Sequence, residues 1–149
     1  MNKQKGILSE VETAQLVQAI QEAELRTSGE IRVHIEQIQK KVSMDRAVEV
    51  FYALGMDKTI NRNGVLLYVC MNTHSFIIIG DEGINKQVPG DYWNTIKDEV
   101  ISFFKEGKIK DGLVRGVELV GQKLVELYPS TGENKDELPN EITSHEDLW

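Results

Sequence analysis

The chain has 149 residues, of which 40% are hydrophobic, and a formal net charge of −7. These values predict one domain that buries roughly two thirds of its chain surface and needs no disulfides to fold. No run approaches the roughly 20 apolar residues of a membrane-spanning helix, and no Lys- and Arg-rich face with interleaved aromatics occurs, which argues against membrane insertion and nucleic-acid binding.

The amino terminus does not resemble an export signal, because only Ile7 and Leu8 interrupt its polar residues. The single cysteine, Cys70, lies in an apolar run and is typical of a small core residue. Lys135 to Leu138 match a retention signal of the endoplasmic reticulum, but such signals are read only at the extreme carboxyl end. We therefore expect a cytoplasmic protein.

Ser9 and Glu12 have the spacing of a capping box and predict the start of a first helix, which ends near Arg26. Its expected inward residues are Val11, Leu16, Ile20 and Ala23. Residues 30–36 then alternate strictly between apolar and polar side chains, which predicts a half-buried strand. Its polar face suggests a position near the sheet edge.

Residues 43–54 predict a second helix, which Ser43 can cap and Gly55 can end. Its expected inward residues are Met44, Ala47, Val48, Phe51 and Leu54. Since a strand, a helix and a strand form a crossover unit, the strand at 30–36 should run parallel to the next one, at 65–71. The link of residues 72–75 is too short to cross a sheet, so the strand at 76–80 should pair antiparallel with the strand at 65–71.

Two further helices follow, one opened by residues 89–91 and closed by Gly107, the other running from near Asp111 to Pro129. Their expected inward residues are Trp93, Ile96, Val100, Phe103 and Phe104 in the first, and Leu113, Val117, Val120, Leu124 and Leu127 in the second. The expected fold is an α/β sandwich of three layers, α/β/α, with a small mixed sheet.

The acidic charge is concentrated at the carboxyl end, with a net charge of −5 in residues 130–149 and −2 in residues 1–129. We interpret residues 1–129 as the folded domain and residues 130–149 as a tail. A solvated, partly disordered segment is the simpler interpretation, and we favour it for residues 130–136. Its apolar residues leave open that the tail docks on the body or on another protein; these are Leu138, Pro139, Ile142, Leu148 and Trp149.

Three polar turns should meet at one end of this sheet, because the first two strands are parallel and the third returns beside them. The turns are residues 27–30, 61–64 and 80–83. Carboxylate and amide oxygens suit calcium or magnesium, so the predicted metal ligands are Glu30, Asn63, Asp81 and Glu82, with Thr27, Ser28, Gly64 and Gly80 as supporting turn residues. Arg62 could instead hold a phosphate or a carboxylate.

Each of these residues also has a purely structural interpretation. Asp81 can cap a short helix, and Asn63 with Gly64 is a common turn pair. Ser28 and Gly29 can end the first helix. His34, His74 and His145 have no second ligand at zinc spacing, and no Walker loop or nucleophile elbow occurs.

Four segments together resemble the TPM domain family, which includes thylakoid-lumen phosphatase-like and photosystem repair proteins. These segments are Thr27–Val33, Asn63–Val69, Ile78–Ile84 and Asp111–Leu113. The resemblance implies an α/β/α sandwich, in some members with bound calcium or a similar cation, and in some an acid phosphatase activity. Other members are accessory factors for the assembly or maintenance of membrane complexes.

Two functions follow as hypotheses. The preferred one is a non-enzymatic binding or accessory module with a divalent cation at the sheet end, whose partner is another protein bound by that end or by the acidic tail. The alternative is a cation-dependent phosphatase acting on phosphomonoesters, with a metal on Asp81 and Glu30 and phosphate held by Arg62. No general base or nucleophile for that chemistry is evident in the sequence.

Overall fold

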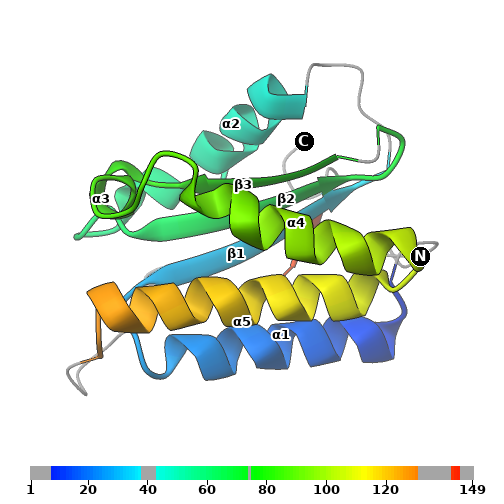
Figure 1. Ribbon diagram of the computed structural model, residues 1–149, viewed down its shortest axis with the longest axis horizontal. Helices are drawn as coiled ribbons and strands as arrows, with labels where there is room; N and C mark the ends of the chain where they lie inside the picture. The colour runs from blue at the N-terminus through cyan, green and yellow to red at the C-terminus, as the bar shows by residue number, and fades with distance from the viewer. Residues whose placement is uncertain (1–7, 38–42, 74, 131–141, 145–149) are drawn as a thin grey trace.

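The computed structural model describes residues 8–37, 43–73, 75–130 and 142–144, and in them a four-stranded mixed sheet has helices on both faces (Figure 1). The strands are β1 (Glu30–Glu36), β2 (Gly64–Cys70), β3 (Ser75–Gly80) and β4 (Thr143–Ser144), in the spatial order β3-β2-β1-β4. This confirms the α/β sandwich. None of the helices in these ranges is long and apolar enough to cross a bilayer. The sequence expectations that concern His74, His145, residues 131–141 and residues 145–149 lie outside the described residues.

The predicted crossover and hairpin are both present. Strands β1 and β2 are parallel, with Glu30 beside Gly64, and are joined through α2 (Ser43–Ala53) and a short 3-10 helix, η1 (Met56–Lys58). Strand β3 is antiparallel to β2, with Val65 beside Gly80. Gly55 lies between α2 and η1 with a φ of 73°, a left-handed conformation that glycine adopts without strain.

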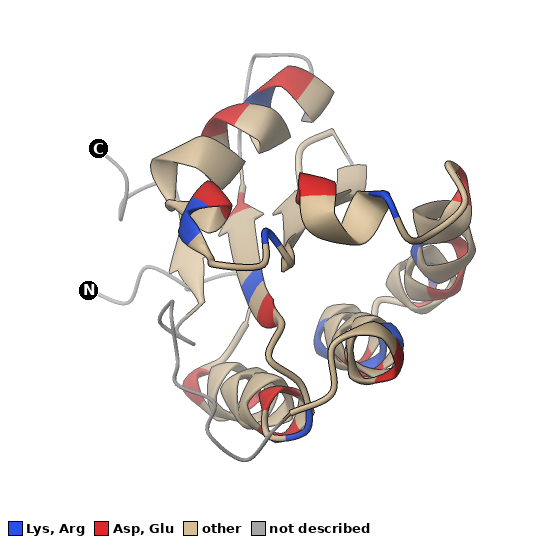
Figure 2. Cartoon of the chain, turned by 90° about the vertical axis from the view of Figure 1, so that its left-hand side faces the viewer, with Lys and Arg blue, Asp and Glu red and all other residues tan. Residues whose placement is uncertain are grey.

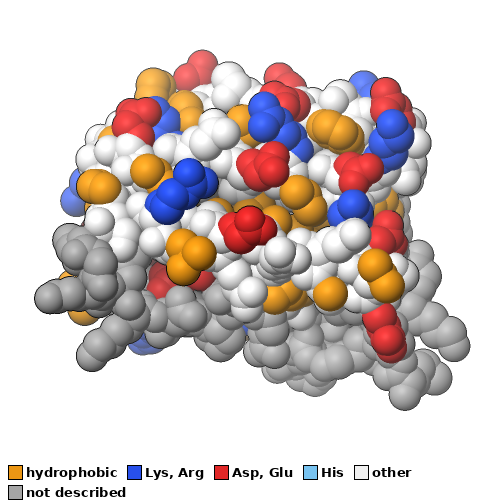
Figure 3. Space-filling model, turned by 90° about the horizontal axis from the view of Figure 1, so that it is seen from below, with side chains coloured by type: hydrophobic (Ala, Val, Ile, Leu, Met, Phe, Trp, Pro, Cys, Tyr) orange, Lys and Arg blue, Asp and Glu red, His pale blue; other side chains and the backbone are white. Residues whose placement is uncertain are grey.

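Helices α1 (Glu10–Glu24), α4 (Tyr92–Lys105) and α5 (Ile109–Leu127) cover one face of the sheet. The capping box of Ser9 and Glu12 is formed. Leu16, Ile20 and Ala23 are buried as predicted, but Val11 is 67% exposed, because it lies in the first turn and off the stripe that faces α5. The outer surface of α1 and α5 mixes acidic and basic side chains (Figure 3).

Helix α2 covers the other face and contacts β2 and β3. Ala47, Val50 and Phe51 are buried, whereas Met44 and Val48 are exposed, so the predicted inward stripe was partly wrong. The inward face of α2 also carries Arg46, which is 1% exposed and forms an ion pair with Glu36.

The alternating side chains of β1 lie on the two faces of the sheet, and both faces are buried. Ile31, Val33 and Ile35 lie in the core beneath α1, α4 and α5. The expected position near the sheet edge is confirmed, since only the two-residue strand β4 lies outside β1, but the expected half-burial is wrong: the polar residues of β1 are at most 3% exposed. These residues are Glu30, Arg32, His34 and Glu36. A second, smaller core packs beneath α2 around Leu66, Tyr68 and Ile77.

Candidate functional site

The two loops that end β3 and begin β2 are joined to each other at one end of the sheet. Strand pairing places Glu30 beside Gly64 and Gly80 beside Val65, so the three turns approach one another there (Figure 2). The Asp81 amide donates to the Gly64 carbonyl at 2.9 Å, and the Gly83 amide donates to the Arg62 carbonyl, also at 2.9 Å. The sequence-based juxtaposition of residues 61–64 and 80–83 is therefore a feature of the fold.

Arg62 is the central side chain of this sheet end. Its φ of 51° is a left-handed conformation, which no other described non-glycine residue adopts. Its Nε lies 2.6 Å from Asp81 Oδ2 and its Nη2 lies 2.8 Å from Asp81 Oδ1, while Nη1 lies 3.1 Å from Glu82 Oε1. The hydrogen bonds with Asp81 raise the pKa of the Arg62 guanidinium. All its nitrogen atoms therefore face carboxylates.

Asp81 also has a structural role as the N-cap of the short helix α3 (Glu82–Asn85), where its Oδ1 accepts from the Glu82 amide at 2.8 Å. Gly83, two residues after Asp81, permits the loop after β3 to touch the loop before β2. A Cβ atom there would lie 2.2 Å from the Asn61 carbonyl oxygen and 2.6 Å from that of Arg62. Only glycine allows this approach without movement of the backbone.

The remaining predicted residues have different surroundings. Asn63 is fully buried; its Nδ2 lies 3.4 Å from Ser28 Oγ, and its Oδ1 has no hydrogen-bond partner among the described residues. Thr27 Oγ1 accepts from the Gly29 amide and lies 2.6 Å from the Tyr128 carbonyl oxygen, so it fastens the end of α5. Glu30 is 3% exposed on the polar face of β1.

The predicted metal ligands are thus only partly together. Asp81 and Glu82 share Arg62, whereas Asn63, the residue after Arg62, has its side chain beside Ser28. In the part of the chain that the structure describes, no three His, Cys, Asp or Glu side chains are placed to share an ion, so Glu30 does not complete such a group with Asp81 and Glu82.

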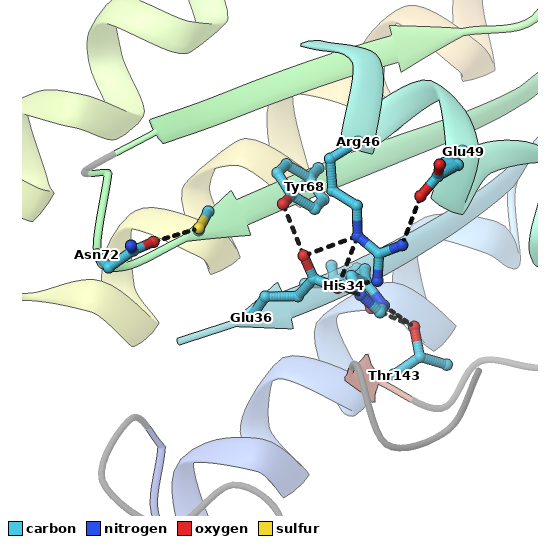
Figure 4. A network of polar contacts seen from close by, with 9 residues as sticks. His34, Glu36, Arg46, Glu49, Tyr68, Asn72 and Thr143 are labelled. Atoms are coloured by element: carbon cyan, nitrogen blue, oxygen red, sulfur yellow. Dashed lines mark hydrogen bonds and ion pairs between the residues drawn. The ribbon is translucent and has the colours of Figure 1, made fainter. Parts of the chain in front are cut away.

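Sequence reasoning missed a buried polar network between β1, β2 and α2 (Figure 4). The Glu36 carboxylate accepts from Arg46 Nε at 3.1 Å and from the Tyr68 hydroxyl at 2.7 Å, and its Oε2 lies 3.0 Å from His34 Nε2. A further bond joins His34 Nδ1 to Thr143 Oγ1 at 2.9 Å, which connects the network to β4. The sequence signal for it is the polar face of β1, but alternation alone predicts a half-buried strand and not a buried network.

The network is electrostatically strong. Burial acts to raise the pKa of Glu36, but the hydrogen bonds from His34, Arg46 and Tyr68 outweigh burial and hold it well below the usual range. Burial, followed by the contact with Glu36, raises the pKa of the Tyr68 hydroxyl. Because His34, Glu36 and Tyr68 are at most 1% exposed, we interpret the network as structural.

The fold and the paired loops define the class of protein as an α/β/α sandwich with a charged sheet end. The family model of the TPM domain matches residues 1–123, and the chain belongs to this family. No curated protein shows significant similarity to the chain.

The chain is similar to several solved structures, among them the following two. The BA42 protein from the psychrophilic bacterium Bizionia argentinensis, determined by NMR, is 43% identical with a TM-score of 0.88, over 97% of this chain and 99% of that one. The N-terminal domain of a protein from P. gingivalis, also an NMR structure, is 23% identical with a TM-score of 0.67, over 83% of this chain and 80% of that one. The second similarity shows the fold alone.

Proposed function

We propose that this TPM domain is a non-enzymatic binding module whose charged sheet end responds to divalent cations and takes part in the assembly or maintenance of protein complexes. The observation that carries this is the position of Arg62, held in a left-handed backbone conformation between Asp81 and Glu82. The guanidinium serves as the counter-charge of both carboxylates. Asp57, whose charge also acts on Arg62, leaves the group with an excess of negative charge.

The oxygen atoms at this sheet end are of the kind that calcium and magnesium bind, but the carboxylates among them are already paired with Arg62. Asp81 and Glu82 supply carboxylate oxygens, and Asn63 supplies a buried amide oxygen that has no hydrogen-bond partner in the part of the chain that the structure describes. However, Arg62 engages both oxygens of Asp81. A cation on Asp81 must therefore compete with Arg62, and its binding would free the guanidinium for a carboxylate of a partner protein.

This competition gives a specific test by titration with calcium and with magnesium, followed by amide chemical shifts. Asp81→Asn should abolish binding, whereas Arg62→Gln should strengthen it several-fold, because it removes the competing charge. Glu126→Gln is a matched control, because Glu126 is 64% exposed and pairs with a lysine, as Glu82 does at 57% exposed. Binding weakened by Arg62→Gln, or shifts that do not cluster at residues 27–30, 61–64 and 80–83, would contradict the proposal.

The geometry gives less support to phosphomonoester hydrolysis. Phosphate capture by Arg62 would require the same release from Asp81 and Glu82 as cation binding does, and hydrolysis would need in addition a nucleophile or general base, for which the sequence gives no evident candidate. The phosphatase alternative therefore stays a prediction from the family resemblance. Activity on a chromogenic phosphomonoester that a chelator and Asp81→Asn both abolish would favour it over the binding module.

A further inference from the structure

An apolar hollow of about 610 Å³, the hairpin hollow, lies at the end of the sheet opposite Arg62, where the β2–β3 hairpin faces the turn between α4 and α5. Five of the residues that line it carry large apolar side chains, namely Val69, Met71, Ile101, Phe104 and Ile109. All but Val69 are only partly buried against the main core, so the hollow is an open extension of that core. Its volume lies within the range of pockets that bury a small ligand.

A groove of similar size between α1 and α5 shows what distinguishes the hairpin hollow. That groove, of about 580 Å³, is lined mostly by glutamine and charged side chains, which water solvates. The hairpin hollow instead has a single charged residue in its lining, Lys105. Its rim is open at Gly107, where an added Cβ atom would meet nothing within 4 Å among the described residues. An apolar ligand can therefore enter and displace water from the apolar walls.

Lys105 brings to this hollow an ammonium group that no described carboxylate neutralises. The other charges of the α4–α5 turn pair with one another: Lys108 Nζ lies 3.4 Å from Glu106 Oε1, and Lys110 Nζ lies 2.7 Å from Asp111 Oδ1. Lys105 makes no ion pair with any residue that the structure describes. The described residues of the hairpin link on the opposite side are uncharged, namely Asn72, Thr73 and Ser75. The hollow therefore combines apolar walls with one available positive charge.

We propose that the hairpin hollow binds a fatty acid, with its unbranched hydrocarbon chain among the apolar walls and its carboxylate on Lys105. The walls favour the chain because burying each methylene group contributes to binding. The ammonium group favours an anion over a neutral alcohol of the same length, because a hydrogen bond between two charged groups is about twice as strong as a neutral one. The site lies at the opposite end of the sheet from Arg62, so it goes beyond the proposed cation-dependent function.

The experiment is a titration of the full chain in chelator with hexanoate, octanoate and decanoate, each below its micelle concentration, followed by amide chemical shifts. We expect shifts that cluster at residues 69–71, 75 and 101–109. The affinity should rise about fourfold for each methylene group that is added, because each group buries further apolar surface. Decanol, which has the same chain without the charge, should bind several-fold more weakly than decanoate.

Two variants test the two parts of the site separately. Lys105→Gln should remove the preference for decanoate over decanol and leave decanol binding unchanged. Lys97→Gln is the matched control, because Lys97 lies on the same helix, also makes no ion pair with a described residue and does not line the hollow. Ile101→Trp places a larger side chain in the hollow and should weaken the binding of both ligands several-fold. Since Ile101 is partly buried, the amide spectrum of this variant checks that it is folded.

Three outcomes would overturn the proposal. The first is the absence of decanoate binding, or binding whose shifts lie outside the hairpin hollow. The second is decanoate binding that is as strong in Lys105→Gln as in Lys97→Gln, or that folded Ile101→Trp leaves unchanged. The third is binding to phosphatidylglycerol vesicles without binding of free decanoate, which would make the hollow a contact for a membrane surface. Since chelator is present throughout, loss of the proposed cation site leaves these measurements unchanged.

Discussion

Arg46→Met is the most direct test of the buried network. Arg46 is 1% exposed, and its guanidinium donates to Glu36 through Nε and Nη2 and to Glu49 through Nη1 at 2.8 Å. Methionine fills a similar volume without a charge. The substitution therefore leaves the Glu36 carboxylate buried, with His34 and Tyr68 as its remaining partners in the network.

The expected loss of folding free energy comes from removing one partner of a buried ion pair. Such changes destabilise proteins by about 3–5 kcal/mol, because the remaining charge loses its compensation. This is a large part of the roughly 5–15 kcal/mol by which a domain is stable, and corresponds to a fall in Tm of about 10 °C or more. Adding Glu36→Gln should recover part of the loss, since the buried charge is then gone.

The assay is urea unfolding of both variants, with Arg115→Met as the matched control. Arg115 makes the same kind of contact, Nε to Glu99 at 2.5 Å, but the two side chains are 37% and 42% exposed. An exposed pair contributes at most about 1 kcal/mol. If Arg46→Met costs no more than Arg115→Met, the network does not stabilise the fold as argued.

The depressed pKa of Glu36 adds a pH signature to the same experiment. Its contribution to stability is complete above the carboxyl pKa of the unfolded chain, about 4.3, and is lost as the pH falls from there toward the lower pKa of the folded state. Glu36→Gln should therefore flatten the dependence of the unfolding free energy on pH below about pH 5. An unchanged slope would show that Glu36 titrates alike in both states.

Two further substitutions test the loops and β4. Gly83→Ala should destabilise the fold by about 1–3 kcal/mol in thermal unfolding, because the added Cβ would meet two backbone carbonyls. Gly90→Ala, where nothing lies within 4 Å of an added Cβ, is the control and should be nearly neutral. Equal effects of the two substitutions would refute the close approach. Thr143→Val removes the hydroxyl that contacts His34 and should cost about 1 kcal/mol in urea unfolding, compared with Thr95→Val, whose exposed hydroxyl bonds only its own helix; equal costs for the two would mean that β4 adds no stability through this contact.

The convergence of the loops could be predicted from the sequence because it depends only on chain direction. A helix between the strands at 30–36 and 65–71 makes them parallel, and a four-residue link makes the next strand antiparallel. These two facts bring residues 61–64 beside 80–83 without any knowledge of side-chain contacts. The pairing of Arg62 with Asp81 does not follow from chain direction, because two carboxylates and one guanidinium in adjacent loops can be arranged in several ways.

The burial of the polar face of β1 could not be predicted, because alternation reports the polarity of each side chain and not its partner. Glu36 can be buried only with a compensating charge, and that charge comes from Arg46, ten residues later on a helix whose own pattern also appeared amphipathic. The two deviations meet at this ion pair: Arg46 lies on the buried face of α2, where it pairs with Glu36, and Met44, Val48 and Tyr52 lie on the exposed face.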